Sequence, residues 1–259
     1  MLKTKSLLFY ALVLLLIGSC NSGNKTNVKQ SRSDTETSDS VKTLLQDELN
    51  AKKANWAAKA SEEKKRIYAE GIAAVENSGI LQTAVQVGDT APNFTLNTIT
   101  NKELTLYDAL MEGPVVLTWY RGGWCPYCNM TLHRLQEELP YIQAEGASLI
   151  ALSPERMEDM SATQDKHQLT FDVASDIGNK VGKQFGIVFK LTDEVAKIYQ
   201  ENFDLHTYNG DESDELPLAA TYIIGKNRVV QYAFLNADYR NRAEPFEIVE
   251  ELKLLRKKK

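Results

Sequence analysis

The sequence predicts an α/β fold, in which helices flank a buried sheet, and three observations predict it. Strand-like and helix-like segments alternate from about residue 85 to the C-terminus. Residues 114–120 form a continuous apolar run of strand length, which is typical of a strand that is covered on both faces. Two β-prone segments, 221–224 and 229–234, flank Gly225-Lys226-Asn227-Arg228, and this arrangement indicates an antiparallel hairpin.

Composition places the chain among ordinary globular proteins. It has 259 residues, of which 43% are hydrophobic and 25% charged, so it can bury a sizeable core without metal or disulfide staples. The 14 glycines and 7 prolines are too few for a collagen-like or low-complexity chain. Since the net charge is −5, electrostatics does not favour nucleic acid as a partner.

The N-terminus has the features of an export signal. Lys3 and Lys5 precede an uncharged apolar run over 7–17, which is shorter than the about 20 residues that cross a membrane. The run ends at Ile17-Gly18-Ser19-Cys20, and this end resembles the lipobox of bacterial lipoproteins. The resemblance implies that Cys20 is lipidated and becomes the mature N-terminus. The alternative is a plain signal peptide with an accidental cysteine.

These features also predict a location. We expect residues 1–19 to be a lipoprotein signal, and an acylated Cys20 to hold the protein at a membrane surface outside the reducing cytosol. The expected location is the bacterial cell envelope. Asn21 stands where an aspartate would resemble an inner-membrane retention signal, which favours the outer membrane. Residues 20–40 are polar, with almost no apolar side chains, and are predicted to be a flexible tether.

A helical extension is predicted over 41–80. Apolar side chains recur there at spacings of three, four and seven residues, and Ser78-Gly79 ends the pattern. Ser61, followed by two glutamates, predicts a break into two helices, with Ser61 as the cap of the second helix. We expect both helices to pack on the domain that follows over 81–259.

Similar patterns predict the remaining elements of 81–259. Helices are expected where apolar residues recur at helical spacing, and strands where short apolar runs end at turn residues. Pro140 predicts a kink or break late in one helix, and Thr192 is a predicted helix cap. The predicted helices are 129–144, 156–167, 181–185, 192–202 and the segment from Glu244 onwards; further strands are predicted at 148–152 and 171–173, and a polar loop at 205–215.

Two cysteines provide the strongest chemical signal. Cys125 and Cys128 form a Cys-X-X-Cys pair where the first buried strand gives way to a helix, the place at which sites of open α/β sheets collect. Cys125 is at the predicted helix cap, where free N–H groups and the helix dipole lower the pKa of a thiol, and Pro126 suits the first helical position. Arg121 adds a permanent positive charge, which Gly122-Gly123 can turn towards the sulfurs.

Other uses of the cysteine pair have less support. A structural zinc site needs four ligands, but the chain has no second cysteine pair, and His133 would add only a third ligand. Attachment of a c-type haem needs a histidine where this chain has Asn129. A purely structural disulfide stays an alternative, although so small a loop stabilises a fold little. We therefore expect no metal and no cofactor, and we assign catalysis to none of the histidines His133, His167 and His206.

Several segments resemble one protein family. Residues 87–96, from Val87 to Leu96, resemble the opening of the alkyl hydroperoxide reductase/thiol-specific antioxidant superfamily, and 120–129 resemble a peroxiredoxin-like subgroup that carries Cys-X-X-Cys. Further likeness to this subgroup lies at 216–217, 220–224, 237–240 and 242–245. The resemblance runs from about 41 to 255. It implies a thioredoxin-like fold, with a central mixed sheet flanked by helices and an N-terminal helical extension.

The chain also departs from the peroxiredoxin pattern. The signature P-x-x-x-T-x-x-C, placed without gaps, puts its proline on Arg121, its threonine on Cys125 and its attacking cysteine on Cys128, and only the last matches. The family carries an arginine just before the strand that begins at Thr221, and thioredoxin-like reductases carry a cis-proline there, but this chain has Ala219. We expect Arg121 to substitute for the missing guanidinium.

Two arguments disagree on which sulfur attacks first. The helix cap favours Cys125, since the first cysteine of such a pair is expected to be the more exposed and the more strongly activated. The superfamily register favours Cys128. We take Cys128 as the attacking cysteine and Cys125 as the resolving one, with the opposite order as the alternative.

The resemblance implies a thiol peroxidase. A thiolate attacks a hydroperoxide and becomes a sulfenic acid, the neighbouring cysteine closes a disulfide, and a thioredoxin-like dithiol restores the pair. One alternative is a thiol–disulfide oxidoreductase for exported proteins, which peroxide consumption would distinguish. Another is a lipid-anchored scaffold with a structural Cys-X-X-Cys, whose function would survive serine at both Cys125 and Cys128. The expected partners are a hydroperoxide or disulfide substrate, a thioredoxin-like reductant and a membrane.

Overall fold

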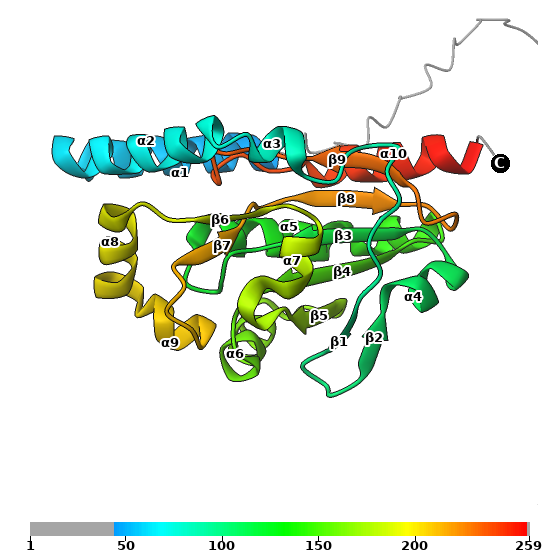
Figure 1. Cartoon of the computed structure of the whole chain (residues 1–259). Coiled ribbons are helices and arrows are strands. Elements are labelled where there is room, and N and C mark those ends of the chain that lie inside the picture. Colours follow the sequence, from blue (N-terminus) through cyan, green and yellow to red (C-terminus); the bar gives the residue numbers. More distant parts are fainter. Residues whose placement is uncertain (1–43, 258–259) are drawn as a thin grey trace, which may run out of the picture. The chain divides into compact units, whose positions relative to one another are not determined.

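A five-stranded mixed sheet lies at the centre of the computed structural model, which describes residues 44–257 (Figure 1). In spatial order its strands are β5 (Asp172–Ser175), β4 (Ser148–Ser153), β3 (Val115–Trp119), β8 (Thr221–Ile224) and β9 (Val230–Phe234). Strands β3, β4 and β5 are parallel, β8 is antiparallel to β3, and β9 is antiparallel to β8. The predicted α/β fold, its central mixed sheet and its 221–234 hairpin are therefore confirmed.

Both faces of the sheet are buried, because alternate side chains of each strand enter two separate cores. On β3, Val116 belongs to one core, whereas Leu117 and Trp119 belong to the other. The first core is closed by α1 (Leu45–Lys59), α5 (Pro126–Ala144), α6 (Met157–His167) and α10 (Pro245–Lys257), and the second by α4 (Leu106–Glu112) and α7 (Lys180–Gln184).

Smaller elements surround these cores. Two short antiparallel sheets pair β1 (Thr95–Asn97) with β2 (Glu103–Thr105), and β6 (Val188–Lys190) with β7 (Glu215–Pro217). The other helices are α2 (Glu62–Asn77), α3 (Ile80–Thr83), η1 (Ile177–Asn179), α8 (Asp193–Phe203) and α9 (Leu205–Asn209). Over residues 44–257, no helix has both the length and the apolar character that crossing a membrane requires.

The helical extension packs on the domain, as predicted. Ser61 separates α1 from α2, and its hydroxyl accepts a hydrogen bond from the Lys64 N–H at 3.2 Å, which confirms the predicted cap. Leu45 and Leu49 of α1 are fully buried in the core that α5 covers. The predicted signal 1–19, the lipidation site Cys20 and the tether 20–40 lie outside the described residues.

Three local predictions need correction. Helix α5 continues through Pro140 to Ala144, so the predicted break, one of the two outcomes expected at Pro140, does not occur; the buried side chains of Leu139 and Ile142 still anchor the helix. Thr192 is the N-cap residue of α8, as predicted, but its side chain makes no capping hydrogen bond. The predicted loop 205–215 instead contains α9 and the start of β7, because apolar side chains at both ends of the segment are buried.

Candidate active site

Helix α5 begins at the cysteine pair. Cys125 is the N-cap residue and Pro126 occupies the first helical position, as predicted, which places Cys128 in the first turn. Both cysteines are free thiols and fully buried. The expectation that Cys125 is the more exposed of the two is therefore wrong. The side chains of Trp124 and Tyr239 pack against the cluster that contains both cysteines.

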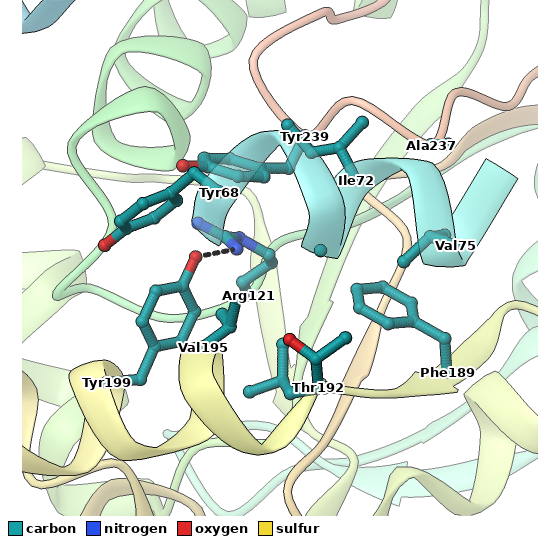
Figure 2. A pocket seen from close by; sticks show the side chains of 12 residues that line it. Tyr68, Ile72, Val75, Arg121, Phe189, Thr192, Val195, Tyr199, Ala237 and Tyr239 are labelled. Atoms are coloured by element: carbon teal, nitrogen blue, oxygen red, sulfur yellow. Dashed lines mark hydrogen bonds between the residues drawn. The ribbon is translucent and has the colours of Figure 1, made fainter. Parts of the chain in front are cut away.

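Arg121 lies against the first sulfur, as predicted. Its Nη2 donates a hydrogen bond to the Cys125 sulfur at 3.3 Å, and its Nη1 donates to the Tyr199 hydroxyl at 2.9 Å. The guanidinium carbon lies 3.6 Å from the centroid of the Tyr239 ring. Figure 2 shows the guanidinium between Tyr68, Tyr199 and Tyr239. Because Arg121 is only 3% exposed, its charge acts on the sulfur with little screening by solvent.

A second arginine, Arg242, lies against the second sulfur; the sequence placed it in a segment that resembles the family subgroup but predicted no role for it in the site. Arg242 Nη2 donates to the Cys128 sulfur at 3.5 Å, and Nη1 donates to the Asn241 carbonyl at 2.9 Å. Arg242 is 6% exposed. Across residues 44–257, no carboxylate lies within salt-bridge distance of Arg121 or Arg242. The two sulfurs are therefore the groups at this site that can become anions beside these two cations.

This environment separates the acidities of the two thiols. Burial by itself opposes ionisation of Cys125, but a hydrogen bond from the Cys128 thiol and the charges of Arg121 and Arg242 outweigh it, so the pKa of Cys125 lies well below its ordinary value. Burial, the hydrogen bond to Cys125 and the negative charge on that sulfur raise the pKa of Cys128 well above its ordinary value. The environment therefore favours ionisation of Cys125 over ionisation of Cys128.

A buried carboxylate holds the loop before the cysteines in place. The Gly123 N–H donates to Glu155 Oε1 at 2.6 Å, and Asn129 Nδ2 donates to the Gly123 carbonyl at 2.8 Å. A Cβ atom at Gly123 would collide with the Thr163 side chain, which explains the glycine. Burial raises the pKa of Glu155 to about 7. Glu155 could have been found from the sequence, because it follows shortly after a buried strand.

An aromatic cleft of about 110 Å³ opens beside Arg121. Tyr68 of α2 and Trp56 of α1 line it, so the helical extension forms part of its wall. Arg121 lines the cleft, so the cleft leads to the guanidinium that contacts the Cys125 sulfur. The other lining residues are Trp124, Pro126, Tyr127, Tyr199, Phe203, Tyr239 and Arg240.

The histidines make other contacts. His133 is exposed on α5 and lies 3.5 Å from Glu137, and His206 lies 2.9 Å from Asp214. Within the described part of the chain, no three His, Cys, Asp or Glu side chains gather in a way that could hold a metal ion.

Residues 87–233 match the AhpC/TSA family. The chain belongs to the AhpC/TSA family. This AhpC/TSA protein is 28% identical over 160 residues to the chloroplastic peroxiredoxin Q of Triticum aestivum, and the match covers 62% of this chain and 64% of the wheat protein. It is 27% identical over 122 residues to the thiol-disulfide oxidoreductase ResA of Bacillus thuringiensis, with coverage of 45% and 69%.

A solved structure extends the likeness to the fold. The peroxidoxin BcpB of Mycobacterium tuberculosis superposes with a TM-score of 0.53 at 19% identity, covering 66% of this AhpC/TSA protein and 98% of BcpB. The fold is therefore the thioredoxin-like fold of peroxiredoxins, as the resemblance implied. Ala219, buried just before β8, leaves this AhpC/TSA site without the arginine that the family pattern places there. Arg121 and Arg242 are the guanidiniums that contact the sulfurs.

Proposed function

We propose that the protein is a thiol-dependent peroxidase that reduces hydroperoxides through Cys125 and Cys128. The observation that carries this proposal is the buried guanidinium of Arg121, 3.3 Å from the sulfur of a cysteine at a helix N-terminus. Membership of the AhpC/TSA family and the likeness to proteins named peroxiredoxin Q support it.

The first step oxidises Cys125. Its thiolate attacks one oxygen of the hydroperoxide, the O–O bond breaks, and the electron pair leaves with the alkoxide or hydroxide, which takes a proton from water. The products are a sulfenic acid on Cys125 and an alcohol or water. The Nε–H of Arg121 is buried and has no hydrogen-bond partner among residues 44–257, so it can donate to an oxygen of the substrate.

This order of attack reverses the one that the superfamily register favours. Arg121 contacts Cys125, whereas Cys128 donates its thiol proton towards the Cys125 sulfur and has a raised pKa. Since the thiolate is the nucleophile, the geometry favours Cys125 as the attacking cysteine.

The second step closes a disulfide. The Cys128 sulfur attacks the Cys125 sulfenic acid, the S–S bond forms, and the S–O bond breaks. The departing hydroxide takes the proton of the Cys128 thiol and leaves as water. An external dithiol, which we propose to be thioredoxin-like, then reduces the disulfide by exchange through a mixed disulfide.

Serine variants test the proposal and the order of attack together. With Cys128 replaced by serine, peroxide should leave a sulfenic acid on Cys125, which dimedone labels and mass spectrometry locates. With Cys125 replaced by serine, peroxide consumption should fall to the level of the double variant. Labelling of Cys128 in the Cys125→Ser protein at the wild-type rate would reverse the order. Peroxide consumption that survives both substitutions would refute the proposed function.

A second candidate function is exchange with disulfides of other proteins. The similarity to ResA, which is named a thiol-disulfide oxidoreductase, supports this second function. That similarity covers less than half of this chain. The low pKa of Cys125 at a helix N-terminus serves either reaction. The rate of reaction with peroxide, compared with the rate of exchange with an oxidised protein, distinguishes the two.

We also propose that the protein is exported and anchored in the bacterial cell envelope through lipid on Cys20. The apolar run 7–17 followed by Gly18-Ser19-Cys20 supports this proposal. Radiolabelled palmitate should be incorporated into the wild-type protein and not into Cys20→Ser, and the variant should leave the membrane fraction. An unlabelled wild-type protein would contradict lipidation.

A further inference from the structure

Two buried cations face the two sulfurs of the site. Arg121 and Arg242 are 3% and 6% exposed, and neither has a carboxylate partner among the described residues. A buried charge is costly unless an opposite charge is close to it. Arg121 contacts the Cys125 sulfur, whose pKa is lowered, whereas Arg242 contacts the Cys128 sulfur, whose pKa is raised. Arg242 is therefore placed to stabilise negative charge on the Cys128 sulfur, in addition to lowering the pKa of Cys125.

We infer that Arg242 is a catalytic residue, whose guanidinium stabilises the negative charge that develops on the Cys128 sulfur while the disulfide closes. This role rests on the proposed function, and on Cys125 as the cysteine that attacks first. Both arginines lower the pKa of Cys125, and Arg242 in addition serves the attack by Cys128.

The reaction itself supplies the anion. In the resting state the Cys125 thiolate opposes ionisation of Cys128. Oxidation converts that thiolate into a neutral sulfenic acid and removes the opposing charge, while the charge of Arg242 stays 3.5 Å from the Cys128 sulfur. As Cys128 gives its proton to the departing hydroxide, its sulfur gains negative charge beside Nη2 of Arg242. A charge-assisted hydrogen bond that strengthens in this step lowers the barrier to closure.

Helix α1 holds Arg242 in place. The Arg242 N–H donates to Gln46 Oε1 at 3.2 Å, and the Glu244 carboxylate accepts the N–H groups of Leu45 and Gln46, each at 3.2 Å. Lys53 further along α1 forms a salt bridge of 3.3 Å with Asp238. Helix α1 thus contacts the loop between β9 and α10 on both sides of Arg242. Gln46 is the positioning residue that binds the backbone of Arg242 itself.

A single-turnover experiment separates the two steps. Reduced wild-type protein and Arg242→Gln are mixed with one equivalent of hydrogen peroxide and quenched at increasing times, and mass spectrometry measures the sulfenic acid and the disulfide. Because the charge of Arg242 also lowers the pKa of Cys125, Arg242→Gln should form the sulfenic acid more slowly than wild type, but this slowing should be smaller than the slowing of closure. Closure of the disulfide should slow by about tenfold or more, because each unit by which the pKa of Cys128 rises removes a factor of ten from its thiolate population. The sulfenic acid should therefore accumulate.

Two further variants make the result decisive. Gln46→Ala keeps the Arg242 guanidinium and removes the hydrogen bond that the Gln46 side chain accepts from the Arg242 backbone N–H. It should therefore also slow closure more than oxidation. This variant tests the role of Arg242 even where Arg242→Gln fails to fold. Arg256→Gln removes an exposed charge that pairs with Glu145, and both of its steps should match wild type. Closure at the wild-type rate in Gln46→Ala and Arg242→Gln, or equal slowing of both steps, would overturn the role of Arg242. A wild-type protein that forms no sulfenic acid would instead overturn the proposed function.

Discussion

Arg121 is the residue on which the acidity of Cys125 depends most directly. Replacing it with alanine removes a hydrogen bond and a buried positive charge from the sulfur. We expect the pKa of Cys125 to rise, and the rate with peroxide near neutral pH to fall by about tenfold for each unit that this pKa rises above the assay pH. Ultraviolet absorbance of the thiolate against pH, with stopped-flow kinetics, measures both. Unchanged peroxide turnover in Arg121→Ala would show that Arg121 does not replace the missing guanidinium.

Glu155 should make stability depend on pH. Its pKa is raised to about 7 from an ordinary value of 4.5, so between these two values the folded protein binds more protons than the unfolded chain. The free energy of unfolding therefore falls as pH rises through this window, by a contribution on the order of 3 kcal/mol. Glu155→Gln lacks this contribution. The free energy of unfolding of the variant minus that of wild type should therefore increase from the acidic to the neutral end of this pH window. Urea titrations of both proteins test this, and a pH-independent difference would contradict it.

Residues of the site differ in how far their roles can be predicted from sequence. Cys125, Cys128 and Arg121 lie within eight positions of one another, so turn and helix-cap chemistry places them without knowledge of the fold. Arg242 is 114 positions from the cysteine that it contacts. The segment 242–245 resembles the family subgroup, but no local pattern places Arg242 beside Cys128, because its position depends on how the β9–α10 loop packs against α1.

Among the elements, α1 should contribute to the stability of the whole domain. Leu49 is fully buried in the core under α5, whereas Leu44, just before the helix, is 48% exposed. Leu49→Ala should lower the free energy of unfolding by about 2–5 kcal/mol, through lost burial and the cavity left behind. Leu44→Ala, the same change at an exposed position, should lie within about 0.5 kcal/mol of wild type. Equal denaturation midpoints for the two variants would show that α1 does not pack as described.

Elements with a local signal are the ones that could be predicted. The start of α5 follows from Cys125 and Pro126, and the break between α1 and α2 follows from Ser61. By contrast, β7 forms because Leu216 pairs with Phe189 of β6, and its three residues are too few to carry a strand pattern of their own. Pairing between distant segments therefore overrides local composition there.

At the scale of the molecule, three distant parts of the chain meet at the cysteine pair. The end of β3 brings Arg121, α2 brings Tyr68, and the loop after β9 brings Tyr239 and Arg242. The thioredoxin-like fold accounts for the position of the cysteines at the end of a buried strand. The helical extension and the C-terminal loop add the wall of the cleft and the second guanidinium, and these additions adapt the site to its proposed reaction.

The most direct test of this account counts thiols in a single turnover. Reduced protein is mixed with hydrogen peroxide and, separately, with an oxidised protein disulfide, and free thiols are titrated over time. The account predicts a rapid loss of both thiols of the Cys125/Cys128 pair for each peroxide consumed, with peroxide reacting faster than the protein disulfide. Slow loss of thiols with peroxide, together with rapid exchange against the disulfide, would contradict it and assign the site to thiol–disulfide exchange.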